Sequence, residues 1–334
     1  MHSNLFKITI LIPCFNKENF LPKLFNSLLK QVDQKFNIIF LDDNSTDKTL
    51  ELLNEFKQNN LNKNIKIINL GKQIGIANAR NLLINNCESE YFYFLDPDDF
   101  IYPKTISYFN EVINKEEKDL VLSNFSLYFR KIKLFNFLQA KWVKIPFNNN
   151  QKIQIQYMLK NLSFVWNILI NKKFWIKSGL SFLKGYIFED ISITSPLILK
   201  SNKIFYTNKK TYAYLLANPK SLMTSFNSFK ILSIAKNLEH LYRNLKRSNL
   251  LQTFNETKIE ERFLKHLLYF DFLFKWKIRK FKKDWKNYKE NLKEFYYVME
   301  KYEIENKMMI YSKKSIFNKI FLNKYLKIKK MIQN

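Results

Sequence analysis

Short apolar runs alternate with amphipathic stretches through the first hundred residues. The apolar runs cover residues 8–12, 37–41, 65–70 and 91–95. Each has the length and character of a buried β-strand, and the first run is expected to stop at Pro13. Stretches with apolar residues at helical spacing follow the first three runs. Four strands alternating with helices predict a mainly parallel sheet that carries helices on both faces.

The helices between these strands have recognisable spacing and start signals. Residues 19–31 and 76–86 place apolar side chains three and four positions apart. The helix after the second strand is expected to begin near Ser45, Thr46 or Asp47, because these residue types cap helix N-termini.

The pattern is less regular after about residue 115. A strand is expected at residues 119–129 and a helix at residues 191–199. Long helical stretches that mix basic and aromatic residues dominate the last part of the chain. We therefore expect an α/β domain over residues 1–225 and a helical, basic C-terminal region over residues 226–334.

The charge of the chain favours an anionic partner. It has 56 Lys and Arg against 29 Asp and Glu, a net charge of +27, which suits nucleic acid, an anionic membrane surface or a phosphorylated substrate. Residues 251–334 hold 21 basic and 10 acidic residues, a net charge of +11, and residues 274–283 interleave aromatic with basic side chains. This mixture predicts contact with an anionic membrane surface. The alternative is a set of helices packed on the α/β domain with their lysines outward.

Cysteine usage and hydropathy indicate where the protein stays. Cys14 and Cys87 do not form a CxxC pair, so neither a disulfide framework nor a zinc site is expected and a reducing cytoplasm is the default. No window approaches the roughly 18 uninterrupted apolar residues of a membrane span, and residues 1–10 lack the layout of a signal peptide. We expect a cytoplasmic protein.

Polar residues directly follow three of the four predicted strands. They are Asn16 after the first strand, Asp42 and Asp43 after the second, and Asp96, Asp98 and Asp99 after the fourth. Ligands of such sheets lie beyond the carboxyl ends of the strands, so these clusters are expected to converge on one edge.

Three aspartates within four positions repel one another unless a cation lies between them. Mg²⁺ or Mn²⁺ typically uses one or two carboxylates plus substrate phosphates, and an acidic residue past a neighbouring strand, here Asp42 or Asp43, can bind a nucleoside base or ribose. A nucleotide sugar would fit both clusters. The alternatives are a solvated turn at Asp96–Asp99 and a helix cap after Asp42.

Four stretches, in this order, resemble the donor half of family 2 glycosyltransferases, the inverting, metal-dependent enzymes of the GT-A fold. They are residues 8–16, 38–53, 75–81 and 91–100. The resemblance is clear over about residues 7–112 and looser to about 225. It implies a Rossmann-like sheet with a donor half over about residues 7–115 and an acceptor half over about 116–225. It also implies transfer of a hexose or N-acetylhexosamine from a nucleotide sugar, with a UDP-sugar favoured.

The resemblance also implies roles for individual residues. Phe15 would lie against the base, Asp43 and Asp42 would bond the base edge and ribose, and Arg80 would lie near the diphosphate unless it forms an ion pair with Asp96 or Asp99. The metal ligands would come from Asp96 and Asp98, or from the later pair with Asp99. The full nucleotide-sugar site implied in this way is Pro13, Phe15, Asn16, Asp42, Asp43, Gly75, Arg80 and Asp96.

The acceptor half supplies the implied catalytic base. Glu189 and Asp190 resemble the family's acidic pair in which the aspartate deprotonates the acceptor hydroxyl, so Asp190 is the candidate base and Glu189 lies beside the acceptor. The alternative is an acidic first turn of a helix. Trp166 is a candidate for stacking on a sugar face or, alternatively, a core residue. Leu215 stands where many members have Arg, which places a phosphate contact there in doubt.

Among members of the family the sequence most resembles bacterial enzymes of the lipooligosaccharide or capsule type. This implies a lipid-linked or cell-surface glycan acceptor, such as lipooligosaccharide, and attachment to the inner face of the cytoplasmic membrane. One alternative is a diacylglycerol glycosyltransferase that makes membrane glycolipid. Another, from a different class, is a basic nucleic-acid-binding protein, which would leave the convergent aspartates unexplained; we expect no nucleic acid partner.

Overall fold

The structure is a computed structural model of the chain. The residues that it describes are 6–129, 164–216, 228–251, 285–303, 323 and 330. They form two compact units. Unit 1 comprises the described parts of residues 1–147, 164–185 and 200–219, and unit 2 comprises residues 186–199 and the described parts of 220–334.

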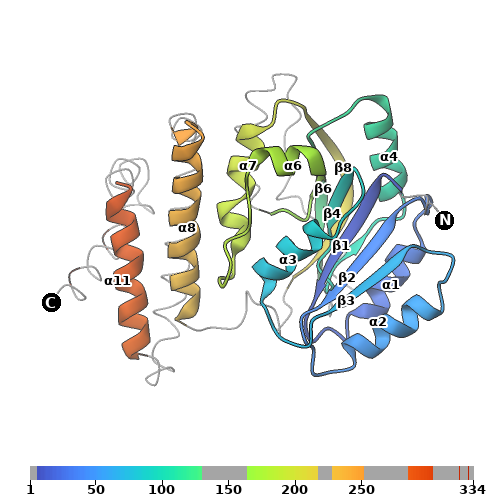
Figure 1. Cartoon of the computed structure of the whole chain (residues 1–334), viewed down its shortest axis with the longest axis horizontal. Helices are drawn as coiled ribbons and strands as arrows, with labels where there is room; N and C mark the ends of the chain where they lie inside the picture. The colour runs from blue at the N-terminus through green and yellow to red at the C-terminus, as the bar shows by residue number, and fades with distance from the viewer. Residues whose placement is uncertain are drawn as a thin grey trace. The chain divides into compact units, whose positions relative to one another are not determined.

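Unit 1 is built on an eight-stranded sheet with the order β3-β2-β1-β4-β7-β6-β8-β5 (Figure 1). The strands are β1 (Ile8–Cys14), β2 (Asn37–Asp42), β3 (Ile65–Asn69), β4 (Tyr91–Phe94), β5 (Phe100–Ile101), β6 (Leu120–Phe129), β7 (Ile168–Asn171) and β8 (Ile204–Leu216). The first four strands are parallel, as are β6 and β8. β7 is antiparallel to β4 and β6, and β5 is antiparallel to β8. The predicted mainly parallel sheet is confirmed.

The first strand extends further than the sequence predicts. β1 continues through Pro13, which pairs with Leu41 of β2, to Cys14. Proline removes a backbone donor and normally ends a strand. Here β4 pairs with β1 only as far as Leu11, so Pro13 lies beyond the part of β1 that has a strand on that side. The absence of a backbone N–H at Pro13 therefore breaks no hydrogen bond between β1 and β4.

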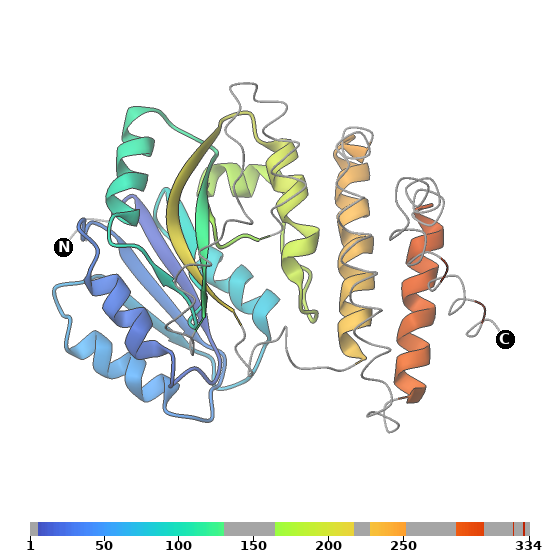
Figure 2. The same cartoon turned by 180° about the vertical axis from the view of Figure 1, so that it is seen from behind.

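Helices cover both faces of the sheet, as the alternating pattern predicts. They are α1 (Leu21–Leu29), α2 (Thr49–Gln58), α3 (Ile76–Asn85), α4 (Thr105–Lys115) and α6 (Lys172–Ser178). Figures 1 and 2 show α1, α2 and α4 on one face and α3 and α6 on the other. Phe40 of β2 contacts Phe25 of α1 and Phe56 of α2 on the first face, with ring centroids 6.0 and 6.1 Å apart.

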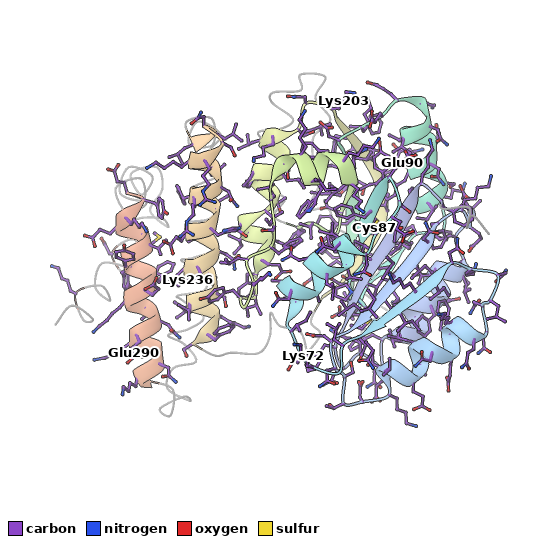
Figure 3. The ribbon with its side chains drawn as sticks, viewed as in Figure 1. Lys72, Cys87, Glu90, Lys203, Lys236 and Glu290 are labelled. Carbon is purple, nitrogen blue, oxygen red and sulfur yellow. The ribbon has the colours of Figure 1, made fainter. Side chains whose placement is uncertain are left out.

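The secondary structure described in unit 2 is helical. The helices are the 3₁₀ helix η3 (Glu189–Ser192), α7 (Thr194–Lys200, whose last residue belongs to unit 1), α8 (Phe229–Arg247) and α11 (Trp285–Lys301). α8 packs against both η3 and α11. Lys236 of α8 lies between α8 and α11 in Figure 3 and pairs with Glu294 at 2.6 Å. No helix within the described residues is long and apolar enough to cross a bilayer.

The two units differ from the two domains expected from the sequence. Residues 186–199 group with the C-terminal helices rather than with the rest of residues 1–225. Within unit 2 this segment contacts α8: Asn237 donates to the carbonyl of Ile187 at 2.9 Å, and Ser233 accepts from the Ile187 N–H at 3.4 Å. The aromatic and basic run at residues 274–283 lies outside the described residues.

Candidate active site

Two carboxylates of the turn after β4 each pair with a cation from another loop or helix. Arg80 of α3 donates to Asp96 at 2.9 Å, and the ammonium group of Lys17 lies 3.2 Å from Asp98 Oδ2. Both aspartates are partly exposed. Repulsion within the turn is thus offset in this structure by Arg80 and Lys17.

The third aspartate of the turn points into the protein. Asp99 is 2% exposed, and its two oxygens accept hydrogen bonds from the Tyr212 hydroxyl at 2.6 Å and from the Leu215 N–H at 2.7 Å. Burial, followed by the charges of Asp98 and Asp96, raises the pKa of Asp99 well above its usual range. Asp99 therefore ties the acidic turn to β8.

Arg80 is enclosed as well as paired. Its guanidinium group lies 5.2 Å from the ring centroid of Phe94 and 5.8 Å from that of Phe182, and the residue is 3% exposed. The neighbouring Asn81 forms two hydrogen bonds with the backbone of Phe182, at 2.9 and 3.0 Å. The ion pair that the sequence offered as the alternative role of Arg80 is present, and it holds Asp96 in place.

The two aspartates at the end of β2 have different surroundings. Asp43 accepts hydrogen bonds from the N–H groups of Ile74 and Gly75, at 2.6 and 2.8 Å, and so fixes the turn before α3, where Gly75 has a φ of +82° that favours glycine. Asp42 Oδ2 accepts from Ser45 N–H at 3.1 Å. Asp42 Oδ1 is buried and has no hydrogen-bond partner among the described residues, an arrangement that costs free energy.

The loops after β1 and β2 are bonded to each other. Asn16, with a φ of 51°, donates its N–H to Ser45 at 3.0 Å and accepts from the Thr46 N–H at 2.8 Å. Phe15 lies beside this junction with 39% of its surface exposed. The hydrogen bonds of Asn16 therefore hold the backbone of the first loop in place, next to the partly exposed side chain of Phe15.

The second helix begins close to its predicted start, and Asp47, one of the expected cap residues, accepts a hydrogen bond from its first residue. α2 starts at Thr49. Asp47 accepts from the N–H groups of Thr49, at 2.9 Å, and of Glu18, at 3.2 Å. Asp47 thus bonds the helix start and the neighbouring loop together.

The candidate residues of the acceptor half are divided between the two units. Trp166, in unit 1, is 2% exposed and stacks on Tyr212 and Phe164, with ring centroids 4.4 and 4.8 Å apart, which agrees with the core alternative. Glu189 and Asp190 lie in the first turn of η3, in unit 2, after Phe188, whose φ is 62°. A left-handed conformation is uncommon for a bulky residue and is found at functional sites.

The residues at the edge of the sheet fit a divalent cation that also binds substrate phosphates. No group of three or more His, Cys, Asp or Glu side chains within the described parts of the chain is arranged to hold a metal ion by itself. Asp96 and Asp98 instead offer partly exposed carboxylates on one turn. One or two carboxylates plus phosphate oxygens is the usual protein environment of Mg²⁺.

Two residues beside these aspartates, Lys17 and Tyr212, are not predicted from the sequence. Lys17 follows the expected Asn16 directly, but a lysine in so basic a chain gives no signal of its own. Tyr212 lies three positions before Leu215, and its bond to Asp99 spans 113 positions. The pairing of Lys17 with Asp98 and that of Tyr212 with Asp99 could not be predicted without knowledge of the fold.

Comparisons with known proteins show the family of the chain. The sequence model of the family described as Glycosyl transferase family 2 matches residues 9–174. The chain is 34% identical over 279 residues to the processive diacylglycerol beta-glycosyltransferase of Mycoplasma pneumoniae, covering 80% of this chain and 81% of that protein. For the enzyme of the same name from Mycoplasma genitalium the identity is 34% over 306 residues, covering 88% of each chain.

Solved structures of glycosyltransferases share the fold. Staphylococcus aureus TarS 1-349 in complex with UDP-GlcNAc has a TM-score of 0.58 at 18% identity, covering 75% of this chain and 72% of that one. The mannosyltransferase PcManGT from Pyrobaculum calidifontis, in complex with GDP-Man and Mn²⁺, has a TM-score of 0.54 at 12% identity, covering 78% and 72%. The fold is thus GT-A, and the similarity to the two Mycoplasma enzymes along most of both chains shows that this chain is a glycosyltransferase of family 2.

Proposed function

We propose that this protein transfers a hexose or N-acetylhexosamine from a UDP-sugar to a hydroxyl group of diacylglycerol, or of a glycolipid built on it, with inversion at the anomeric carbon. The proposed acceptor rests on the 34% identity, over 80% or more of both chains, to two enzymes named as processive diacylglycerol beta-glycosyltransferases. The lipooligosaccharide acceptor favoured by the sequence alone takes second place, because these relatives match the alternative.

The donor proposal rests on the edge formed by the loops after β1 and β2. Asp42 Oδ1 is a buried acceptor without a donor among the described residues, and a base N–H or a ribose hydroxyl would satisfy it. Phe15 supplies a partly exposed ring on which a base can stack. The TarS structure that shares the fold holds UDP-GlcNAc, which supports a UDP-sugar. Asp43 keeps a role in shaping this site, because its oxygens fix the turn at Gly75.

Asp96 and Asp98 are the proposed ligands of Mn²⁺ or Mg²⁺. Asp99 is better suited to supporting the turn from inside, because both of its oxygens already accept hydrogen bonds. A divalent ion bound at such a site supplies charge stabilisation for a departing diphosphate. The Mn²⁺ in the PcManGT structure supports this cofactor.

Asp190 is the proposed general base. It would accept the proton of the attacking hydroxyl while the new C–O bond forms at the anomeric carbon and the bond to the diphosphate oxygen breaks. No covalent intermediate with the enzyme is needed. Two features of the described residues support Asp190: it is only partly buried in η3, and the left-handed Phe188 holds the backbone before it in an uncommon conformation.

Calorimetry with UDP tests the donor and metal proposals. UDP should bind at least about tenfold more tightly with Mn²⁺ than with a chelator, since the ion links its phosphates to the acidic turn. Asp98→Asn should remove most of this metal dependence. The control is Glu111→Gln, which alters an exposed ion pair with Lys115 on α4. Equal UDP affinity of the wild-type protein with and without Mn²⁺ would contradict the metal proposal.

Contact with an anionic membrane surface is proposed to bring the enzyme to its lipid acceptor. α11 of unit 2 carries exposed side chains at helical spacing on one face: Lys286, Lys289, Lys293 and Tyr297, with the exposed Glu290 and Glu300 beside them. Each lysine near an anionic surface contributes about 1 kcal/mol to binding.

Transfer to diacylglycerol in vesicles tests the acceptor and the surface together. Labelled sugar from UDP-glucose or UDP-galactose should appear in glycolipid, and at least about tenfold faster in anionic than in neutral vesicles. Changing Lys286, Lys289 and Lys293 to Gln should reduce this preference while detergent-dispersed diacylglycerol is still glycosylated. If no glycolipid forms with any common UDP-sugar, the acceptor proposal is wrong.

A further inference from the structure

Lys17 is placed between the loop that carries Phe15 and the acidic turn. Its ammonium group lies 3.2 Å from Asp98 Oδ2 and 5.4 Å from the ring centroid of Phe20. Its backbone N–H donates to Thr49 Oγ1 at 2.7 Å. The neighbouring Asn16 and Glu18 are also bonded to the loop after β2. The backbone of Lys17 is therefore fixed, and only its side chain has freedom to change partner.

The pair between Lys17 and Asp98 can exchange at little cost. The two side chains are 18% and 17% exposed, and partly exposed ion pairs add little to stability, in part because the long lysine side chain loses conformational freedom. A divalent cation carries twice the charge of an ammonium group and competes for the same carboxylate. When Asp98 binds such a cation, Lys17 loses its partner.

A diphosphate is the group that would next attract this lysine. The diphosphate of a nucleotide sugar carries two negative charges and gains a third when it departs as UDP, and the divalent cation near it is shared with the Asp98 carboxylate, so a further cation is favoured there. Arg80 is poorly suited to move toward it, because it is 3% exposed, bonded to Asp96 and enclosed by two aromatic rings. Lys17 is more exposed and lies two positions after Phe15, the proposed base contact.

We propose that Lys17 is a donor-binding residue that exchanges partners: it holds Asp98 while the donor site is empty and binds the diphosphate of the nucleotide sugar once Asp98 holds the metal ion. This inference rests on the proposed donor and metal sites. Lys17 then has two opposite effects on affinity. It weakens binding of the metal ion when no nucleotide is present, and it strengthens binding of the nucleotide. A lysine that served only to hold the turn would have the first effect alone.

Calorimetry with three ligands on Lys17→Met tests the exchange. We expect Mn²⁺ alone to bind about threefold or more tightly than to the wild type, because its competitor is gone. We expect UDP at saturating Mn²⁺ to bind about tenfold more weakly, because a charged contact to phosphate is lost. Uridine, which lacks the diphosphate, should bind with unchanged affinity.

Two further variants keep this result interpretable. Lys17→Arg retains a cation and should restore UDP affinity to within about threefold of the wild type. Lys30→Met removes an exposed lysine that follows α1 and should change none of the three affinities. If Lys17→Met binds UDP as tightly as a wild type that does bind it, the exchange is refuted while the proposed function stands. If the wild type itself does not bind UDP, both are refuted.

Discussion

Asp190→Asn should abolish sugar transfer while leaving UDP binding intact. Asn has nearly the same shape as Asp but cannot take the proton of the acceptor hydroxyl. General-base catalysis typically contributes about 10²–10⁴-fold, so kcat should fall by at least about a hundredfold. Because the proposed donor contacts come from the loops after β1, β2 and β4, the affinity for UDP with Mn²⁺ should stay within about twofold of the wild type.

The measurement pairs a transfer assay with calorimetry on the same preparations. Labelled product from a UDP-sugar and a diacylglycerol acceptor gives kcat, and UDP titration gives the donor affinity. Glu303→Gln, which changes an exposed carboxylate just after α11 in the same unit, is the matched control and should leave both unchanged. Transfer by Asp190→Asn at close to the wild-type rate would show that another group is the base. Loss of UDP binding would show instead that Asp190 supports the donor site.

The strands that build the donor edge could be predicted because their side chains are buried on both faces. The runs at residues 37–41 and 91–95 lie within one residue of β2 and β4, since a central parallel strand must be apolar throughout. The same topology brings the ends of these strands to one edge, so the convergence of Asp42 with Asp96 follows from the alternating pattern.

The individual roles of the aspartates could not be predicted, because identical side chains differ only in partners that are distant in sequence. Asp99 turns inward since Tyr212 and Leu215, more than a hundred positions later, supply its donors. Asp98 faces Lys17 across 81 positions. Asp43 is engaged by the turn at Gly75, whereas the adjacent Asp42 keeps an oxygen without a donor among the described residues. These contacts depend on strand register, which the local sequence does not contain.

Asp99→Ala should destabilise unit 1 far more than Asp98→Ala, although the two aspartates are adjacent. Removing the Asp99 carboxylate leaves the Tyr212 hydroxyl and the Leu215 N–H buried without an acceptor, at about 1–3 kcal/mol each. Removing Asp98 loses only a partly exposed ion pair with Lys17, which contributes about 0–1 kcal/mol. Thermal unfolding followed by calorimetry should therefore give a midpoint several degrees lower for Asp99→Ala than for Asp98→Ala.

Asp99→Asn separates the hydrogen bonds of Asp99 from its charge. The amide oxygen can still accept from the Leu215 N–H, but the amide nitrogen cannot accept from the Tyr212 hydroxyl, so only part of the lost stability should return. Burial raises the pKa of Asp99, which means that its charge is itself costly here, and a neutral amide avoids that cost. If Asp99→Ala unfolds at the same temperature as Asp98→Ala, the bond from the acidic turn to β8 does not stabilise the fold. In that case the turn that carries Asp96 and Asp98 would be held by its other contacts, which include the ion pairs with Arg80 and Lys17 and the bond from the Asp96 N–H to the Tyr212 hydroxyl.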